Sequence, residues 1–144
     1  MTPGRAALER LIVAAGLGQF ALVAASLAIP RILHWREQAA LLRPLTRQIF
    51  TTYACYIVGT NLSFALISVL APGWLLEGSG LGASVTGFMA LYWGARVAVQ
   101  FLYYDRRDAP AGAFFQFAEG ALVLLFLFLT VTYGLSMAHN LSGS

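Results

Sequence analysis

Two charged residues, Arg96 and Glu119, each stand inside a long apolar run, on either side of a short charged turn. A charge near the centre of a bilayer costs roughly 3 kcal/mol or more, so ionisable residues there pair with one another or serve a function. Arg96 could hold an anion or a lipid headgroup, and Glu119 could carry a proton. The same two residues could instead form a structural lock that fixes the register of the helices around them.

The two charges are placed at matching depths. Arg96 lies about 13 Å, and Glu119 about 12 Å, along a helix from the turn that joins their apolar runs. Gln100 is one helical turn from Arg96, and Gln116 is close to one turn from Glu119, so a hairpin would let these polar strips face each other. We predict a buried ion pair between Arg96 and Glu119, flanked by the two glutamines. Further polar groups expected at this cluster come from the second apolar run: Asn61, Thr52 and Tyr56.

The composition predicts that these elements lie in lipid. The 144 residues are 59% hydrophobic and only 10% charged, with a mean hydropathy of +0.73, which is more apolar side chain than one soluble core could hide. Apolar windows reach the roughly 20 residues that a helix needs to cross a bilayer, at 11–29, 49–71, 83–104 and 113–136. We therefore expect an all-α integral membrane protein over residues 1–144, with four transmembrane helices arranged as two antiparallel hairpins in a compact bundle.

The loops between the windows differ in character. Pro30 is expected to close the first span, and residues 31–48 are amphipathic enough to lie along the cytoplasmic interface. Pro44 should end the first part of that segment. Trp35 and Trp74 are natural interface anchors. The outer loop, 71–84, is rich in glycine and predicts a turn with a shallow return into the membrane.

Charge placement predicts the orientation. Basic residues concentrate in the two loops expected on one side, whereas the other side holds only Arg5 and Arg10. By the positive-inside rule, the basic loops are cytoplasmic and both termini lie on the outer side. Because every basic residue is arginine, we expect a GC-rich bacterial source and a place in the bacterial cytoplasmic (inner) membrane. An alternative is that the first apolar window is a cleaved signal peptide, although it is longer than the usual h-region. The loop arginines are Arg31, Arg36, Arg43, Arg47, Arg106 and Arg107.

Small residues suggest where helices approach closely. Residues of this kind recur at spacings of three and four in the first and third windows, as in helix-association motifs of membrane proteins. These faces could close a tight bundle or bind a second copy or another membrane protein. The residues are Ala14, Gly18, Ala21 and Ala25 in the first window, and Gly87, Ala90, Gly94 and Ala98 in the third.

Several classes of function find no support in the sequence. Cys55 has no second cysteine with which to form a disulfide or a metal site, and we expect it to be a small buried residue. His34 and His139 fall a membrane apart and could not both bind one haem. No protease, nucleotide-binding or hydrolase motif occurs. We therefore expect no catalytic residues, metal, cofactor or nucleic-acid partner.

Two functional hypotheses remain. The first is a non-enzymatic accessory, scaffold or assembly subunit of a membrane complex, because nearly the whole chain is expected to be membrane helix. The second is a small oligomeric transporter or channel with a polar intramembrane site around Arg96 and Glu119.

Overall fold

The structure of the protein is a computed structural model that describes residues 3–103 and 112–143. All regular elements in this part of the chain are helices. Arg106 and Arg107, and with them the second basic loop, lie outside the described residues. In chain order the elements are α1 (Pro3–Ile32), α2 (Trp35–Ala40), α3 (Pro44–Leu70), the 3-10 helix η1 (Pro72–Leu76), α4 (Gly80–Leu102) and α5 (Ala113–Ser142).

Local sequence explains where several helices begin. Pro44 stands in the first turn of α3, where its missing N–H costs no helical hydrogen bond. Ser79 caps α4, and its hydroxyl accepts a hydrogen bond from the backbone N–H of Gly82 at 2.9 Å. Gly112 precedes α5 with φ 138°, a backbone conformation that side chains disfavour.

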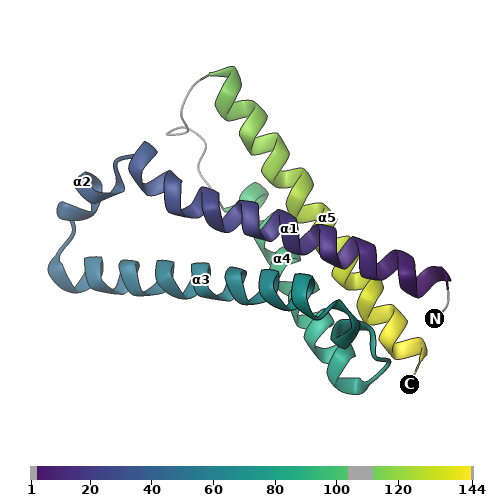
Figure 1. Ribbon diagram of the computed structural model, residues 1–144. Coiled ribbons are helices and arrows are strands. Elements are labelled where there is room, and N and C mark those ends of the chain that lie inside the picture. The colour runs from purple at the N-terminus through teal and green to yellow at the C-terminus, as the bar shows by residue number, and fades with distance from the viewer. Residues whose placement is uncertain (1–2, 104–111, 144) are drawn as a thin grey trace.

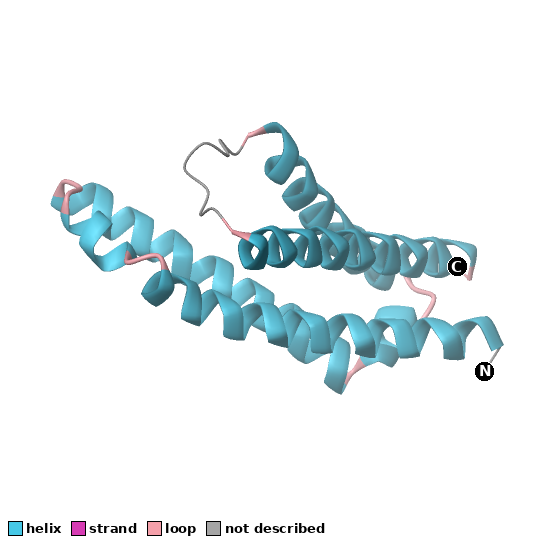
Figure 2. Ribbon diagram, turned by 90° about the horizontal axis from the view of Figure 1, so that it is seen from above, coloured by secondary structure: helices cyan, strands magenta, loops and turns pink. Residues whose placement is uncertain are grey.

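The long helices form two antiparallel pairs, α1 with α3 and α4 with α5 (Figures 1 and 2). The pairs meet at the end of the molecule that holds both termini and η1, and α2 caps the opposite end of the first pair (Figure 1). Towards that opposite end the N-terminal half of α5 turns away from the α1–α3 hairpin (Figure 1). The buried residues of α5 all lie from Phe126 onward, so the core occupies one end of the bundle.

An aromatic and aliphatic core joins the two pairs. Trp93 of α4 stacks on Phe126 of α5 with ring centroids 5.5 Å apart, and Met89 and Leu129 are fully buried beside them. η1 contributes to this core rather than lying on the surface, because Leu75 and its neighbour Leu76 are buried. The short connection between α3 and α4 therefore packs against the helices that it joins.

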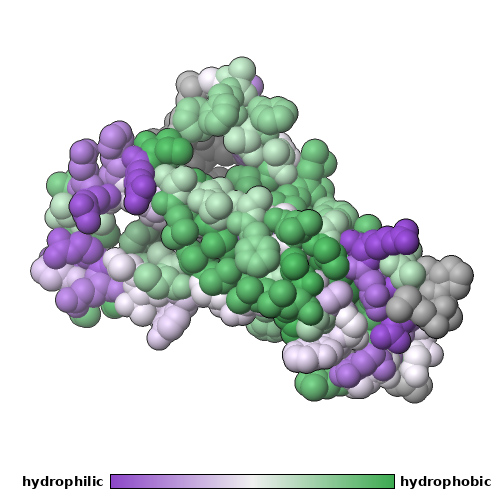
Figure 3. Space-filling model, in the orientation of Figure 1, coloured by the Kyte–Doolittle hydropathy of each residue, from purple (hydrophilic) through white to green (hydrophobic). Residues whose placement is uncertain are grey.

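Three helices are long and apolar enough to cross a membrane: Gly4–Ile32, Pro44–Leu70 and Ala113–Ser142. α4, which contains Arg96 and Gln100, is not among them. On the face seen in Figure 3, apolar side chains form a broad band between polar groups at the two ends. These features are those of a multi-pass membrane protein.

One expectation about the first loop needs correction, and one about the cysteine. Pro30 does not close the first span, because α1 continues to Ile32 and the amide of Leu33 still bonds to the carbonyl of Ile29 at 2.9 Å. Pro30 supplies no N–H to the Ser26 carbonyl, and α1 ends only two residues after it. Residues 31–48 hold the short helix α2 and the start of α3 at Pro44, with a non-helical backbone at Arg43, and their place along the interface stays a prediction. Cys55 is exposed rather than buried.

Candidate functional site

The sequence predicts a polar cluster around Arg96 and Gln100 of α4 and Glu119 of α5, and these helices pack against each other. The Gln100 amide donates a hydrogen bond to the Glu119 carboxylate at 3.1 Å. The Arg96 guanidinium lies over the ring of Phe126, 5.6 Å from its centroid, in a cation–π contact. Arg96, Gln100 and Glu119 are each partly buried. Direct pairing of Arg96 with Glu119 stays a prediction, and Gln116 is exposed.

Asn61 takes part in a second contact between the helix pairs. Its side-chain oxygen accepts a hydrogen bond from the Tyr92 hydroxyl at 2.8 Å, and Asn61 is buried. The Tyr92 ring packs edge-on against Phe64 of α3 and Trp93 of its own helix. Tyr92 is one turn from Arg96, so this contact adjoins the cluster through a residue that sequence reasoning did not select.

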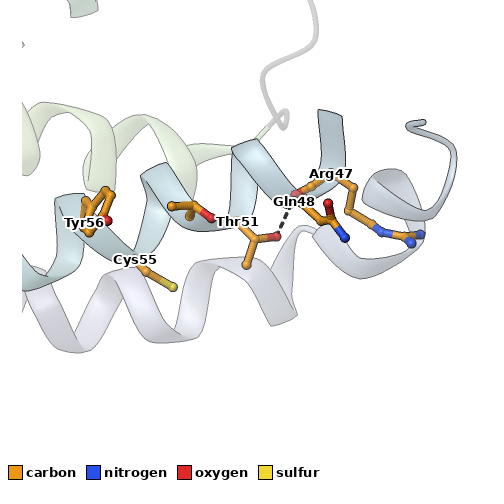
Figure 4. Close-up of a pocket in the computed structure, with 6 residues that line it drawn as sticks. Arg47, Gln48, Thr51, Cys55 and Tyr56 are labelled. Atoms are coloured by element: carbon orange, nitrogen blue, oxygen red, sulfur yellow. Dashed lines mark hydrogen bonds between the residues drawn. The ribbon is translucent and has the colours of Figure 1, made fainter. Parts of the chain in front are cut away.

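Thr52 and Tyr56 lie elsewhere. Both are exposed on α3, where they line an open groove with Arg47 and its neighbours (Figure 4). A helix turns about 100° per residue, which places Thr52 about 180° and Tyr56 about 140° around the helix from Asn61. Thr52 and Tyr56 share only their expected depth with the cluster, and depth does not decide which face of a helix a side chain occupies.

A buried polar cluster that the sequence argument missed joins three helices at Tyr133 of α5. The Gln19 amide of α1 donates a hydrogen bond to the Tyr133 hydroxyl, and Ser68 of α3 shares a second hydrogen bond with it at 2.6 Å. Gln19, Ser68 and Tyr133 are fully buried. We call Gln19, Ser68 and Tyr133 the tyrosine clasp. In an apolar interior each of these groups would be costly without its partner, so the clasp fixes how α1, α3 and α5 sit together.

Asn140 of α5 fixes the segment between α3 and α4, at the same end of the bundle as the tyrosine clasp. Its amide nitrogen donates to the Leu75 carbonyl at 2.8 Å, and its side-chain oxygen accepts from the Gly78 backbone N–H at 2.9 Å. Gly82 at the start of α4 packs directly on the same side chain. One buried residue of α5 thereby holds η1 and the turn that follows it.

The sequence contains a pattern from which the tyrosine clasp and the Asn140 contacts could be predicted. Gln19, Ser68, Tyr133 and Asn140 are polar residues inside or next to apolar windows, where lipid offers no hydrogen-bond partner. Uncharged polar residues within apolar windows therefore indicate contacts between helices, as charged residues do.

Some of the small residues of α1 and α4 pack against α5 within the chain, and others are exposed. A side chain at Gly87 would meet Met137, and one at Gly94 would meet Thr130, so this part of α4 packs against α5. Gly18 of α1 similarly packs against Leu125 of α5. The remaining small residues of the two faces are exposed at Ala14, Ala21 and Ala98, and partly buried at Ala25 and Ala90.

The two tryptophans expected at the interfaces differ in exposure. Trp74 in η1 is 69% exposed at the end that holds the termini. Trp35 begins α2 and packs edge-on against Phe50 of α3, with centroids 5.7 Å apart, so it attaches α2 to the hairpin.

Comparison with protein-family models, with curated proteins and with solved structures finds no match to this chain. Among the residues that the structure describes, no three histidine, cysteine, aspartate or glutamate side chains come together as metal ligands do. The polar contacts instead run between helices, and their chemistry is that of hydrogen bonds that hold helices in register.

Proposed function

We propose that the protein is a non-enzymatic accessory, scaffold or assembly subunit of a membrane complex. The observation that carries this proposal is the position of the core at one end of the bundle. At the other end large side chains are left uncovered, among them Tyr53 on α3 and Phe114 and Phe117 on α5. A helix partner inserted between or beside the diverging pairs would bury these side chains and close the bundle along its full length.

We further propose four membrane crossings, with both termini on the outer side of a bacterial inner membrane. The 23 residues of α4 span about 35 Å, enough to cross a hydrocarbon core of about 30 Å. Its polar residue Gln100 bonds to α5 within the chain, so it need not face lipid. Arg31, Arg36 and Arg43 lie around α2, away from the termini, which supports a cytoplasmic α2.

A site-specific crosslinking experiment in the native host tests the assembly role. A photoreactive amino acid replaces Phe117, which is 76% exposed, and in a control chain it replaces Met89, which is fully buried. We expect crosslinking at position 117 to one protein that also co-purifies in fixed stoichiometry in mild detergent, and no such product at position 89. Recovery of the chain alone, with only lipid adducts at position 117, would contradict the proposal.

A transporter or channel is the second candidate, and the hydrogen bond between Gln100 and Glu119 favours it, because it places an ionisable group inside the helix pair. Exchanging the charges, with Arg96→Glu and Glu119→Arg together, separates the two candidates. A structural lock keeps its stability in the exchanged chain, whereas a transport site loses or reverses its ion selectivity. Ion flux into liposomes and thermal unfolding of the same preparations measure the two properties.

A further inference from the structure

An open groove of about 480 Å³ runs along the first half of α3 (Figure 4). It is lined by Arg47, Gln48, Thr51, Thr52, Cys55 and Tyr56. The groove lies at the α2 end of the molecule, where α3 begins and the core does not reach.

The chemistry of the groove changes in order along the helix. The guanidinium of Arg47 comes first, the amide of Gln48 and the hydroxyls of Thr51 and Thr52 follow, and the ring of Tyr56 comes last. From Arg47 to Tyr56 the rise is about 13 Å. A phospholipid presents groups in the same order from the membrane surface inward, namely a phosphate, the ester oxygens of its glycerol backbone and an acyl chain.

Most of the polar groups in the groove are available to a ligand. The Thr51 hydroxyl donates to the Arg47 carbonyl at 2.9 Å. Within residues 3–103 and 112–143, the side chains of Arg47, Gln48 and Thr52 make no hydrogen bond or ion pair. Exposed donors on a membrane helix need acceptors, and a hydrocarbon chain supplies none.

The surroundings of the groove are positive. Arg36 in α2 and Arg43 just before α3 add to the charge of Arg47, and the acidic residue of α2, Glu37, lies 4.0 Å from His34. The packing of Trp35 against Phe50 holds α2 at this end of α3. An anionic headgroup is attracted to such a cluster, and a zwitterionic one is attracted less.

We propose that this groove binds an anionic phospholipid, with the phosphate at Arg47, the glycerol backbone at Gln48 and Thr52, and an acyl chain along Tyr56. The proposal is independent of the assembly role above. Ile49 is exposed and lies within about 20° of Tyr56 around the helix, so it offers an apolar surface to the remaining acyl chain.

The test measures lipid retained by the full chain. Protein in bilayers of phosphatidylcholine with a minor fraction of phosphatidylglycerol is released and its bound lipids are counted by native mass spectrometry. We expect one retained phosphatidylglycerol, and about tenfold less retention in Arg47→Gln, because a charge-assisted hydrogen bond is lost. Arg47→Lys should restore part of the retention, and Thr52→Val should lower it by about threefold.

The matched control is Arg43→Gln, which removes an exposed arginine that does not line the groove. A clearly smaller loss of retention in this variant than in Arg47→Gln supports a defined site, because Arg43 adds to the surrounding positive charge but does not line the groove. Equal loss in Arg43→Gln and Arg47→Gln overturns the proposal in favour of diffuse attraction, and so does wild-type retention of both lipids in proportion to their supply. Displacement of the lipid by inorganic phosphate also overturns it, because the site would then bind a free anion. If Arg47→Gln loses its helical circular dichroism, the Arg47→Lys and Thr52→Val variants decide.

Discussion

Tyr133→Phe is the sharpest test of the tyrosine clasp, because it removes one oxygen atom and keeps the buried ring. The lost hydroxyl accepts a hydrogen bond from Gln19 of α1 and shares another with Ser68 of α3. After the change, the Gln19 amide still reaches the Ala15 carbonyl of its own helix at 3.3 Å. Ser68 is then left as the buried group that most needs a new partner.

The expected cost follows from these contacts. Hydrogen bonds between membrane helices contribute about 0.6 kcal/mol each on average, so the two lost bonds account for about 1.2 kcal/mol. A buried hydroxyl that finds no new partner adds about 1 kcal/mol. We therefore expect Tyr133→Phe to lower the free energy of unfolding by about 1 to 2 kcal/mol, which is roughly a 5- to 30-fold change in the folding equilibrium.

The free energy of unfolding is measured by sodium dodecyl sulfate titration in mixed micelles, followed by circular dichroism. Tyr53→Phe is the matched control, because Tyr53 is 62% exposed and its hydroxyl makes no hydrogen bond among the described residues. We expect no change there. The double variant with Ser68→Ala should cost less than the sum of the single changes, since both remove the same contact. Equal stability of Tyr133→Phe and wild type would refute the role assigned to the clasp.

Two further predictions concern close packing and the turn between α3 and α4. Gly16→Ala should destabilise the fold by about 1–3 kcal/mol, because the added carbon would lie 2.7 Å from Val69. Gly120→Ala, where nothing lies within 4 Å, should instead stabilise by up to about 1 kcal/mol, and the same detergent unfolding compares the two. Asn140→Leu leaves the buried Leu75 carbonyl without its partner, so hydrogen exchange over residues 72–82 should speed up relative to α3. Unchanged exchange there would show that Asn140 does not hold the turn.

Much of the secondary structure could be predicted from hydropathy. The windows 11–29 and 49–71 lie within α1 and close to the bounds of α3, and 113–136 lies within α5. The helices extend past the first and last of these windows by several residues. A helix can continue through polar residues beyond the membrane, because its backbone hydrogen bonds do not depend on apolar side chains. Hydropathy marks only the part of the helix that prefers lipid.

The arrangement of the helices was harder to predict, for reasons that particular residues illustrate. Gln100 and Glu119 were expected together and do form a hydrogen bond. The small residues Gly87 and Gly94 were expected to allow close approach, but the sequence did not say that the approach is to α5 of the same chain. The tyrosine clasp depends on the crossing of three helices, which no spacing within one helix encodes.

The place of the tyrosine clasp in the chain bears on how the protein is made. Tyr133 and Asn140 both belong to the C-terminal half of α5, which leaves the ribosome after every other helix described. Until that half is synthesised and inserted, native hydrogen-bond partners are missing for Gln19, Ser68 and the Leu75 carbonyl. The earlier helices can already pack on one another, as Gly16 does against Val69, but these polar groups still await α5. The contacts that join α1, α3 and η1 to α5 can therefore form only after α5 has been translated and inserted.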